Sequence, residues 1–192
     1  MTTARQLGRP ATLADLEALP PTMRGEIIDG TLYTSPRPRA RHAAVEGGLV
    51  ENLRGPFMGG RGGPGGWWIL SEPGIELPRA AEFSPDVAGW RIERMAELPT
   101  GPITVVPDWI CEILSPSTRG YDMVVKRRFY AEIGVAFLWY VDPEARTLMV
   151  SKRIEGGYLE LAVYGEKDKV RAEPFAAVEI SLADWWGDLE SE

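Results

Sequence analysis

The sequence predicts an α/β fold in which strands and helices follow one another through the second half of the chain. Residues 109–114 form an almost wholly apolar run of strand length. Residues 121–133 carry apolar side chains every four positions, at Val125, Phe129 and Ile133, as a helix packed on a sheet does. Residues 137–143 then form a second buried strand that ends in a turn. We therefore expect a sheet that is covered by at least one helix.

The first predicted elements are a short helix and a hairpin. Residues 12–19 predict a helix that Thr12 caps and that Pro20-Pro21 ends. The pair Asp29-Gly30 is a strong signal for a tight turn between two strands. A hairpin centred on these two residues is therefore expected.

A longer helix is predicted over residues 42–54, where the apolar positions repeat every four residues, at Val45, Leu49 and Leu53. Gly47-Gly48 weakens this prediction by up to about 1 kcal/mol per glycine. His42, the sole histidine, opens the helix. We favour a surface or capping role for His42 over one in which it faces a functional site or a phosphate.

Residues 55–66, GPFMGGRGGPGG, are too rich in glycine for regular structure, and we read them as a connector. They lack the Gly-Lys-Ser/Thr ending of a phosphate-binding loop, so nucleotide binding through that motif is not expected. The segments WWIL at 67–70 and GIEL at 74–77 predict a hairpin or a bent strand pair. This pair leads into a short strand that follows Asp86.

The C-terminal third predicts two further strands, TLMVSKRI at 147–154 and YLELAVY at 158–164, joined by Glu155-Gly156-Gly157. Asp142 ends the preceding strand, and we favour turn capping over catalysis for it. The chain closes with SLADWWGDLESE at 181–192, where Trp185 and Trp186 predict a short helix. We favour docking of this helix on the core over docking on a second subunit.

Length and composition agree with one cytoplasmic domain over residues 1–192. The first residues lack the apolar region of a secretion signal, and no run approaches the roughly 18 apolar residues of a membrane span. The single Cys111 cannot form an internal disulfide and is most simply a core residue. Zinc is not expected, because the chain has no cluster of cysteine and histidine.

A carboxylate interrupts the apolar strand at 109–114. Alternation places Trp109, Cys111 and Ile113 on one face and Ile110, Glu112 and Leu114 on the other. Glu112 therefore has apolar neighbours on its own side, where an ionised carboxylate is costly unless it is paired or binds a metal. Ser115-Pro116 ends the strand, so Glu112 lies close to a strand end.

Other charged residues fit a site around Glu112. Asp122, Lys126 and Tyr130 form one row of the following helix, beside its apolar stripe. On spacing alone we favour an ordinary surface pair of Asp122 and Lys126. Asp86 changes this balance, because it precedes Glu112 by 112 − 86 = 26 residues, enough for two neighbouring strands. Two carboxylates and a lysine are what a magnesium-dependent nuclease requires.

Together, these residues resemble the Uma2-type (DUF820) restriction endonuclease family within the PD-(D/E)XK nuclease superfamily. The resemblance covers most of the chain, and its segments occur in the family's order: GEIIDG at 25–30, SPDVAGW at 84–90, PDWICEILSPST at 107–118, then Asp122, Lys126 and Tyr130, and FLWYVDP at 137–143. It implies a restriction-endonuclease-like α/β (α+β) core, with a central mixed β-sheet flanked by helices. It also implies Mg²⁺ or Mn²⁺ as cofactor and cleavage of DNA phosphodiester bonds.

Carried over by position, the resemblance makes Asp86 and Glu112 metal ligands and Lys126 the catalytic lysine. We add the backbone carbonyl of Ile113 as a further ligand. The superfamily lysine normally lies two residues after the glutamate, where this chain has Leu114. Lys126 would have to replace that lysine from the helix.

Three further residues are candidates at the same site. Glu26 in GEIIDG is either an additional metal or water ligand or an exposed residue beside the hairpin turn, and both interpretations stay open. Asp122 and Tyr130 would orient Lys126 or a water molecule.

The charge of the chain argues against general DNA binding, because 21 basic and 28 acidic residues give a net charge of −7. DNA contacts must then be local, and the candidates are Arg119, Arg127 and Arg128 around the helix and Arg61 in the glycine-rich loop. That loop is alternatively one that closes over DNA. Arg37, Arg39 and Arg41 after the hairpin are also candidates for such contacts, although we favour a solvated surface for them.

Three functions remain open, and the first is a metal-dependent DNA endonuclease. The second is an inactive nuclease fold that binds DNA or a protein, as the net acidity and Leu114 suggest. The third is another carboxylate-based hydrolase, such as a glycosidase, with Asp86 and Glu112 as acid and base. A homodimer is a reasonable expectation for an enzyme that cuts duplex DNA.

Overall fold

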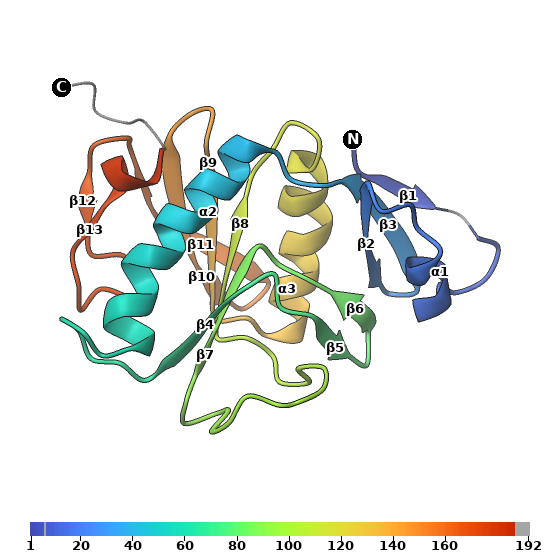
Figure 1. Ribbon diagram of the computed structural model, residues 1–192, viewed down its shortest axis with the longest axis horizontal. Helices are drawn as coiled ribbons and strands as arrows, with labels where there is room; N and C mark the ends of the chain where they lie inside the picture. Colours follow the sequence, from blue (N-terminus) through green and yellow to red (C-terminus); the bar gives the residue numbers. More distant parts are fainter. Residues whose placement is uncertain (6, 187–192) are drawn as a thin grey trace.

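A six-stranded mixed sheet forms the centre of the computed structural model, which describes residues 1–5 and 7–186 (Figure 1). Its strand order is β11-β10-β9-β8-β7-β4. Only β8 and β9 pair in parallel, and the other neighbours pair antiparallel. The strands are β4 (Trp67–Ser71), β7 (Val87–Arg91), β8 (Trp109–Ile113), β9 (Phe137–Asp142), β10 (Thr147–Ile154) and β11 (Gly157–Tyr164).

A second sheet has the strand order β1-β3-β2-β6-β5. Asp29 and Gly30 both have positive φ angles in the turn between β2 and β3, as expected for a tight hairpin. The strands are β1 (Thr3–Arg5), β2 (Met23–Ile28), β3 (Thr31–Pro36), β5 (Ile75–Leu77) and β6 (Ala80–Phe83). A short ribbon pairs β12 (Lys169–Val170) with β13 (Ile180–Ser181).

The predicted pairing of WWIL with GIEL is wrong. The first segment is β4, which pairs with β7 in the central sheet, whereas the second is β5, which pairs with β6 in the other sheet. The two faces of β4 contribute to both core clusters, with Trp67 and Ile69 in one and Trp68 and Leu70 against the other, as expected for a strand inside the central sheet.

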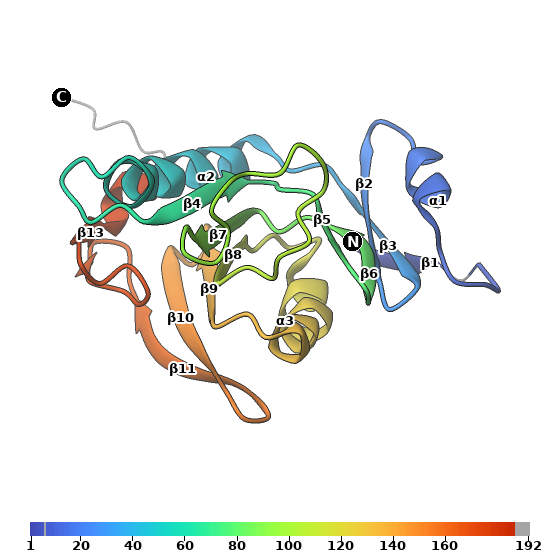
Figure 2. The ribbon, with the colours of Figure 1, turned by 90° about the horizontal axis from the view of Figure 1, so that it is seen from below.

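The two longest helical segments cover opposite faces of the central sheet (Figure 2). α2 packs on the face that carries Trp109, Cys111 and Ile113, and α3 packs on the face that carries Ile110 and Leu114. The predicted alternation along β8 is therefore confirmed, and Glu112 lies on the face of α3. The helical segments are α1 (Leu13–Glu17), α2 (Ala40–Leu53), η1 (Arg54–Met58), η2 (Tyr121–Lys126), α3 (Arg127–Ile133) and η3 (Leu182–Trp185).

The glycine-rich loop begins with regular structure, contrary to the prediction. Residues 54–58 form a π-helical turn that continues α2. Burial of Phe57 explains this turn, because its ring packs against Phe175 at a centroid distance of 4.7 Å. The apolar contact outweighs the low helix propensity of the adjacent Gly55.

The tryptophans near the C-terminus dock on the core, as predicted. Trp185 and Trp186 are buried in the same cluster as α2, and Trp185 Nε1 donates to Asn52 Oδ1 at 2.8 Å. The rest of that segment, residues 187–192, lies outside the described residues. None of the helices in residues 1–5 and 7–186 has the length and apolar character that a membrane span needs.

Gly47 and Gly48 provide a matched test of how α2 packs against η3. A Cβ atom on Gly48 would lie 2.9 Å from the carbonyl oxygen of Asp184 and 3.0 Å from Cα of Trp185, both backbone atoms, whereas Gly47 faces open space. We expect Gly48→Ala to lower the free energy of unfolding by about 1–3 kcal/mol. Gly47→Ala should raise it by up to about 1 kcal/mol through helix propensity.

Urea unfolding of both variants measures these changes. Equal effects of the two substitutions would contradict the close approach of α2 to η3.

Candidate functional site

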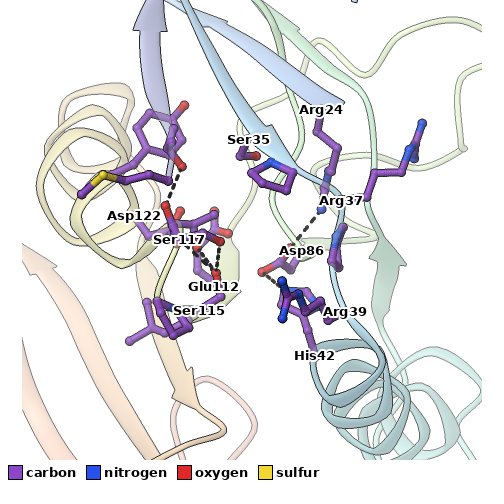
Figure 3. A pocket seen from close by; sticks show the side chains of 18 of the residues that line it. Arg24, Ser35, Arg37, Arg39, His42, Asp86, Glu112, Ser115, Ser117 and Asp122 are labelled. Carbon is purple, nitrogen blue, oxygen red and sulfur yellow. Dashed lines mark hydrogen bonds and ion pairs between the residues drawn. The ribbon is translucent and has the colours of Figure 1, made fainter. Parts of the chain in front are cut away.

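A cleft of about 550 Å³ opens where β8 ends (Figure 3). Its walls come from β2, β3, the segment before α2, the start of α2, and the loop that joins β8 to η2. The residues whose side chains were predicted to bind metal or to act in catalysis line the cleft: Glu26, Asp86, Glu112, Asp122 and Lys126. Tyr130 is the exception, because it is buried and contacts Glu112 from the helix. The fold therefore brings together residues that lie as far apart in the sequence as Glu26 and Lys126.

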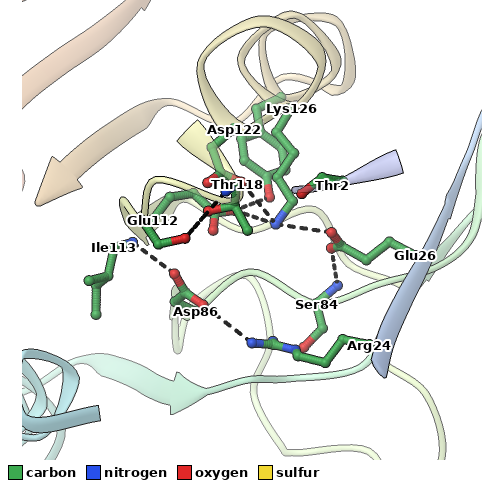
Figure 4. A network of polar contacts seen from close by, with 12 residues as sticks. Thr2, Arg24, Glu26, Ser84, Asp86, Glu112, Ile113, Thr118, Asp122 and Lys126 are labelled. Carbon is green, nitrogen blue, oxygen red and sulfur yellow. Dashed lines mark hydrogen bonds and ion pairs between the residues drawn. The ribbon is translucent and has the colours of Figure 1, made fainter. Parts of the chain in front are cut away.

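Glu112 is held by two donors from the helix that covers its face. Its side chain is 1% exposed, and Oε1 accepts a hydrogen bond from Lys126 Nζ at 3.0 Å (Figure 4). The Tyr130 hydroxyl donates to the same oxygen. Lys126 therefore reaches the site from the helix, as the absence of a lysine at position 114 requires.

The row of Asp122, Lys126 and Tyr130 is buried, so the surface-pair interpretation of Asp122 and Lys126 is wrong. Asp122 and Lys126 are each 4% exposed, with Oδ1 and Nζ 3.9 Å apart. In the predicted apolar stripe Phe129 is buried, but Val125 and Ile133 are only half-buried. The π-helical turn Tyr121–Lys126 explains the difference, because its wider spacing changes which side chains face the sheet.

Glu26 belongs to the site, and its interpretation as an exposed hairpin residue is wrong. Its side chain is 14% exposed on β2. Oε2 lies 3.2 Å from Lys126 Nζ, and Oε1 accepts a hydrogen bond from the Ser84 backbone N–H at 2.9 Å. One ammonium thus bridges carboxylates from two different sheets.

Asp86 lies beside Glu112 but has different partners. Its Oδ2 accepts from the Ile113 backbone N–H at 2.8 Å and lies 3.0 Å from His42 Nε2. Arg24 Nη1 lies 3.7 Å from Oδ1. The favoured surface or capping role of His42 is therefore wrong. The first turn of α2 points into the cleft, and His42 lies in that turn.

The Ile113 backbone faces Asp86. In a strand, the N–H and C=O of one residue point to the same edge, so the Ile113 carbonyl is directed to the edge on which its N–H meets Asp86. The next residue, Leu114, bonds through its N–H to Val141 on the opposite side.

The pKa values of the two central carboxyl groups move in opposite directions. Burial alone would raise the pKa of Asp86, but the His42 hydrogen bond, the charges of His42 and Lys126 and the Ile113 N–H lower it below its ordinary value. Burial raises the pKa of Glu112 well above its ordinary value, and the negative charges of Asp86, Asp122 and Glu26 add to this against the effect of Lys126. Asp86 is therefore the firmly ionised member.

Lys126 stays protonated at neutral pH. Burial alone would lower its pKa, but Glu112, Glu26, Asp122 and Asp86 raise it above its ordinary value. Four carboxyl groups thus act on one ammonium. A divalent cation would neutralise this excess of negative charge.

The donor set fits a hard cation. Among residues 1–5 and 7–186, no group of three or more His, Cys, Asp and Glu side chains is arranged to hold a metal. Mg²⁺ usually takes only one or two carboxylates, together with waters and substrate phosphate. Asp86, Glu112 and the Ile113 carbonyl supply oxygen donors of this kind, so the residues fit Mg²⁺ or Mn²⁺ and not a closed zinc site.

The predicted DNA contacts are not gathered at this cleft. Arg119 pairs with Asp142, and Arg128, whose side chain is 83% exposed, pairs with Glu132. Arg127 donates to the Tyr158 carbonyl on β11. Arg61 does not line the cleft.

The turn-capping role predicted for Asp142 is confirmed. Its Oδ1 accepts hydrogen bonds from the backbone N–H groups of Glu144 and Ala145.

Sequence reasoning missed other residues of the cleft. Arg24 could have been found, because strand alternation places it on the same face as Glu26. Arg37, Arg39 and Arg41 were candidates for nucleic-acid contact, and they line the cleft although a solvated surface was favoured for them.

Comparisons with known proteins show the family of the chain. A family profile named Uma2, described as "Putative restriction endonuclease", matches residues 11–183. The chain belongs to the Uma2 family. The resemblance inferred from the sequence is thereby confirmed, and membership of Uma2 supports a nuclease.

A solved structure has the same fold as this Uma2 chain. It is a crystal structure from Anabaena variabilis ATCC 29413, described as a "putative nuclease belonging to DUF820". The TM-score is 0.70 at 23% sequence identity, and the match covers 92% of this chain and 98% of the other. The comparison with curated proteins gives no match.

We expect Lys126→Met to destabilise the protein by about 3–5 kcal/mol, because it leaves buried carboxylates without their ammonium. Arg128→Met on the same helix removes an equal charge from an exposed side chain and should leave the unfolding midpoint unchanged. Urea unfolding near pH 7 in EDTA measures both. Equal midpoints for the two variants would contradict the structural role of Lys126.

The raised pKa of Asp122 predicts that the stability of the protein depends on pH. Burial, opposed by Lys126, raises its pKa to about 6, above the ordinary 3.8. The folded state therefore binds this proton more tightly, and stability is lost as pH rises through this window. A difference of about two pH units corresponds to roughly 3 kcal/mol.

Asp122→Asn removes this titration. Between pH 4 and pH 7, its free energy of unfolding should therefore rise relative to the parent by up to roughly 3 kcal/mol. Urea unfolding in EDTA at both pH values measures the change. A difference that stays constant would show that Asp122 titrates normally.

Proposed function

We propose that this Uma2 protein is a metal-dependent DNA endonuclease that hydrolyses phosphodiester bonds with Mg²⁺ or Mn²⁺. One observation carries the proposal: the ammonium of Lys126 lies between Glu112 and Glu26 in the lining of a cleft that also contains Asp86. Paired carboxylates and a fixed cation are the groups that metal-assisted phosphate hydrolysis uses.

Asp86, Glu112 and the Ile113 carbonyl would hold the metal. When bound, a divalent cation supplies Lewis-acid stabilisation for negative charge that develops on the phosphate. The low pKa of Asp86 keeps one ligand ionised before the metal arrives. DNA is the substrate that we infer from membership of Uma2.

Lys126 acts as a fixed positive charge. Its raised pKa keeps Nζ protonated, so it does not remove a proton from water. Glu112 and Glu26 hold the ammonium at 3.0 and 3.2 Å, and Asp122 lies 3.9 Å away. From this position Nζ can orient the attacking water and stabilise a phosphate oxygen without reorganising.

Tyr130 positions Glu112. Burial and the neighbouring charge of Glu112 raise the pKa of the Tyr130 hydroxyl well above its ordinary value. The hydroxyl therefore stays protonated and donates to Glu112 Oε1. This fixes one oxygen of Glu112 on the helix side.

A non-catalytic binding module is the second candidate. Arg24 and His42 already provide positive partners for Asp86, so this carboxylate is compensated without a metal. Such a module would bind DNA or a protein and would keep that binding after Glu112→Gln.

The third candidate is a carboxylate-based hydrolase, such as a glycosidase, and its activity would survive in EDTA.

We expect the purified protein to nick supercoiled plasmid DNA in Mg²⁺ or Mn²⁺ and to lose this activity in EDTA. Asp86→Asn and Glu112→Gln should each lower the rate by about 10²-fold or more, because each removes charge from the site. Agarose gel electrophoresis measures the rates. Glu155→Gln, an equal change in the exposed turn after β10, is the control.

Two results would decide against the endonuclease. Cutting that survives EDTA would support metal-free chemistry. DNA binding without cutting in either metal would support the binding module.

A further inference from the structure

Three arginines on one side of the cleft are not used by the proposed chemistry. Arg37, Arg39 and Arg41, here called the arginine wall, are exposed and line the cleft. Figure 3 shows Arg37 and Arg39 on the same side as His42 and Asp86, with Ser115 and Ser117 on the other side. The wall therefore lines the same cleft as Asp86 and Glu112.

The arginine wall has no carboxylate partner among the residues that the structure describes. Arg37 Nε donates to the Pro21 carbonyl at 2.6 Å, and the side chains of Arg39 and Arg41 have no hydrogen bond or ion pair with any other described residue. Other arginines of the described chain do pair with acids, as Arg79 does with Asp29. In a chain with a net charge of −7, three arginines within five residues, without acidic partners among the described residues, form a local concentration of positive charge.

The backbone presents the arginine wall in a restricted shape. Pro36 and Pro38 alternate with the first arginines, and each proline favours an extended conformation at the residue before it. Arg39 is itself extended, with φ −97° and ψ 169°, and α2 then begins without an acidic residue in its first turn. Binding along this segment therefore orders little additional backbone.

We propose that the arginine wall binds the phosphodiester backbone of the DNA strand and guides it over Asp86 and Glu112. The inference rests on the proposed function, and it adds where the substrate lies. Guanidinium groups match phosphate oxygens in charge and in bidentate geometry. The net charge of −7 disfavours DNA binding by the chain as a whole, so a local group of arginines is needed to attract the strand.

The opposite side of the cleft is suited to a neighbouring phosphate or sugar. Ser115 Oγ lies 2.9 Å from Ser117 Oγ and 3.0 Å from Thr118 Oγ1. These hydroxyls donate or accept without a net charge. The positive charge that draws the strand in is therefore on the side of the arginine wall.

Salt-dependent binding tests the proposal with a charge-matched control. Arg39→Ala/Arg41→Ala removes two charges from the wall, and Arg54→Ala/Arg153→Ala removes two from exposed positions that do not line the cleft. Binding to a fluorescein-labelled 20-base-pair duplex is measured by anisotropy without divalent metal, between about 50 and 200 mM salt. Thermal unfolding confirms that each variant is folded.

We expect the wall variant to bind at least about tenfold more weakly and its salt slope to fall by about 1.8, at about 0.9 per lost phosphate contact. The control should keep the parent slope. Arg39→Lys/Arg41→Lys retains both charges and should restore the slope.

An unchanged slope in the wall variant, with salt-dependent binding by the parent, would overturn the inference and leave the proposed nuclease standing. Equal losses in both double variants would also overturn it, because the contribution would then be one of net charge. A parent protein without any DNA binding would overturn both proposals.

Discussion

The ion pair of Lys126 with Glu112 and Glu26 is the constraint on which the site depends. It joins a helix that covers the central sheet to β8 and to the second sheet. A buried ammonium is tolerated only where several acceptors surround it, and buried carboxylates likewise need a cation. Because each group requires the others, the position of η2 and α3 over β8 is fixed together with the chemistry of the cleft.

The cleft separates its charges into two groups. Glu112, Glu26 and Asp122 surround Lys126 on the helix side, whereas Asp86 lies toward Arg24 and His42 on the other. Negative charge exceeds positive charge on the helix side, which raises the pKa of Glu112. A divalent cation near Asp86 and Glu112 would correct this imbalance, and arginines beyond Asp86 would attract the phosphates that accompany it.

Much of the fold could be predicted because strand alternation is a local property. It placed Glu112 on the face opposite Trp109, Cys111 and Ile113, and the equally local turn signal of Asp29-Gly30 located the hairpin. The burial of Lys126 could not be predicted from an α-helical period, because a π-helical turn changes the orientation of its row. The contact of His42 with Asp86 depends on where α2 begins relative to β7, which is a tertiary property without a local signal.

The most direct test is the anomalous diffraction of a crystal soaked in Mn²⁺ together with a short DNA strand. The account predicts a peak ligated by Asp86 and Glu112, with oxygen distances near 2.1 Å, as a Mg²⁺-like ion requires. Lys126 should still contact Glu112. A complex with DNA in the cleft but no peak, and with Asp86 still bound by Arg24 and His42, would contradict metal-dependent hydrolysis at this site.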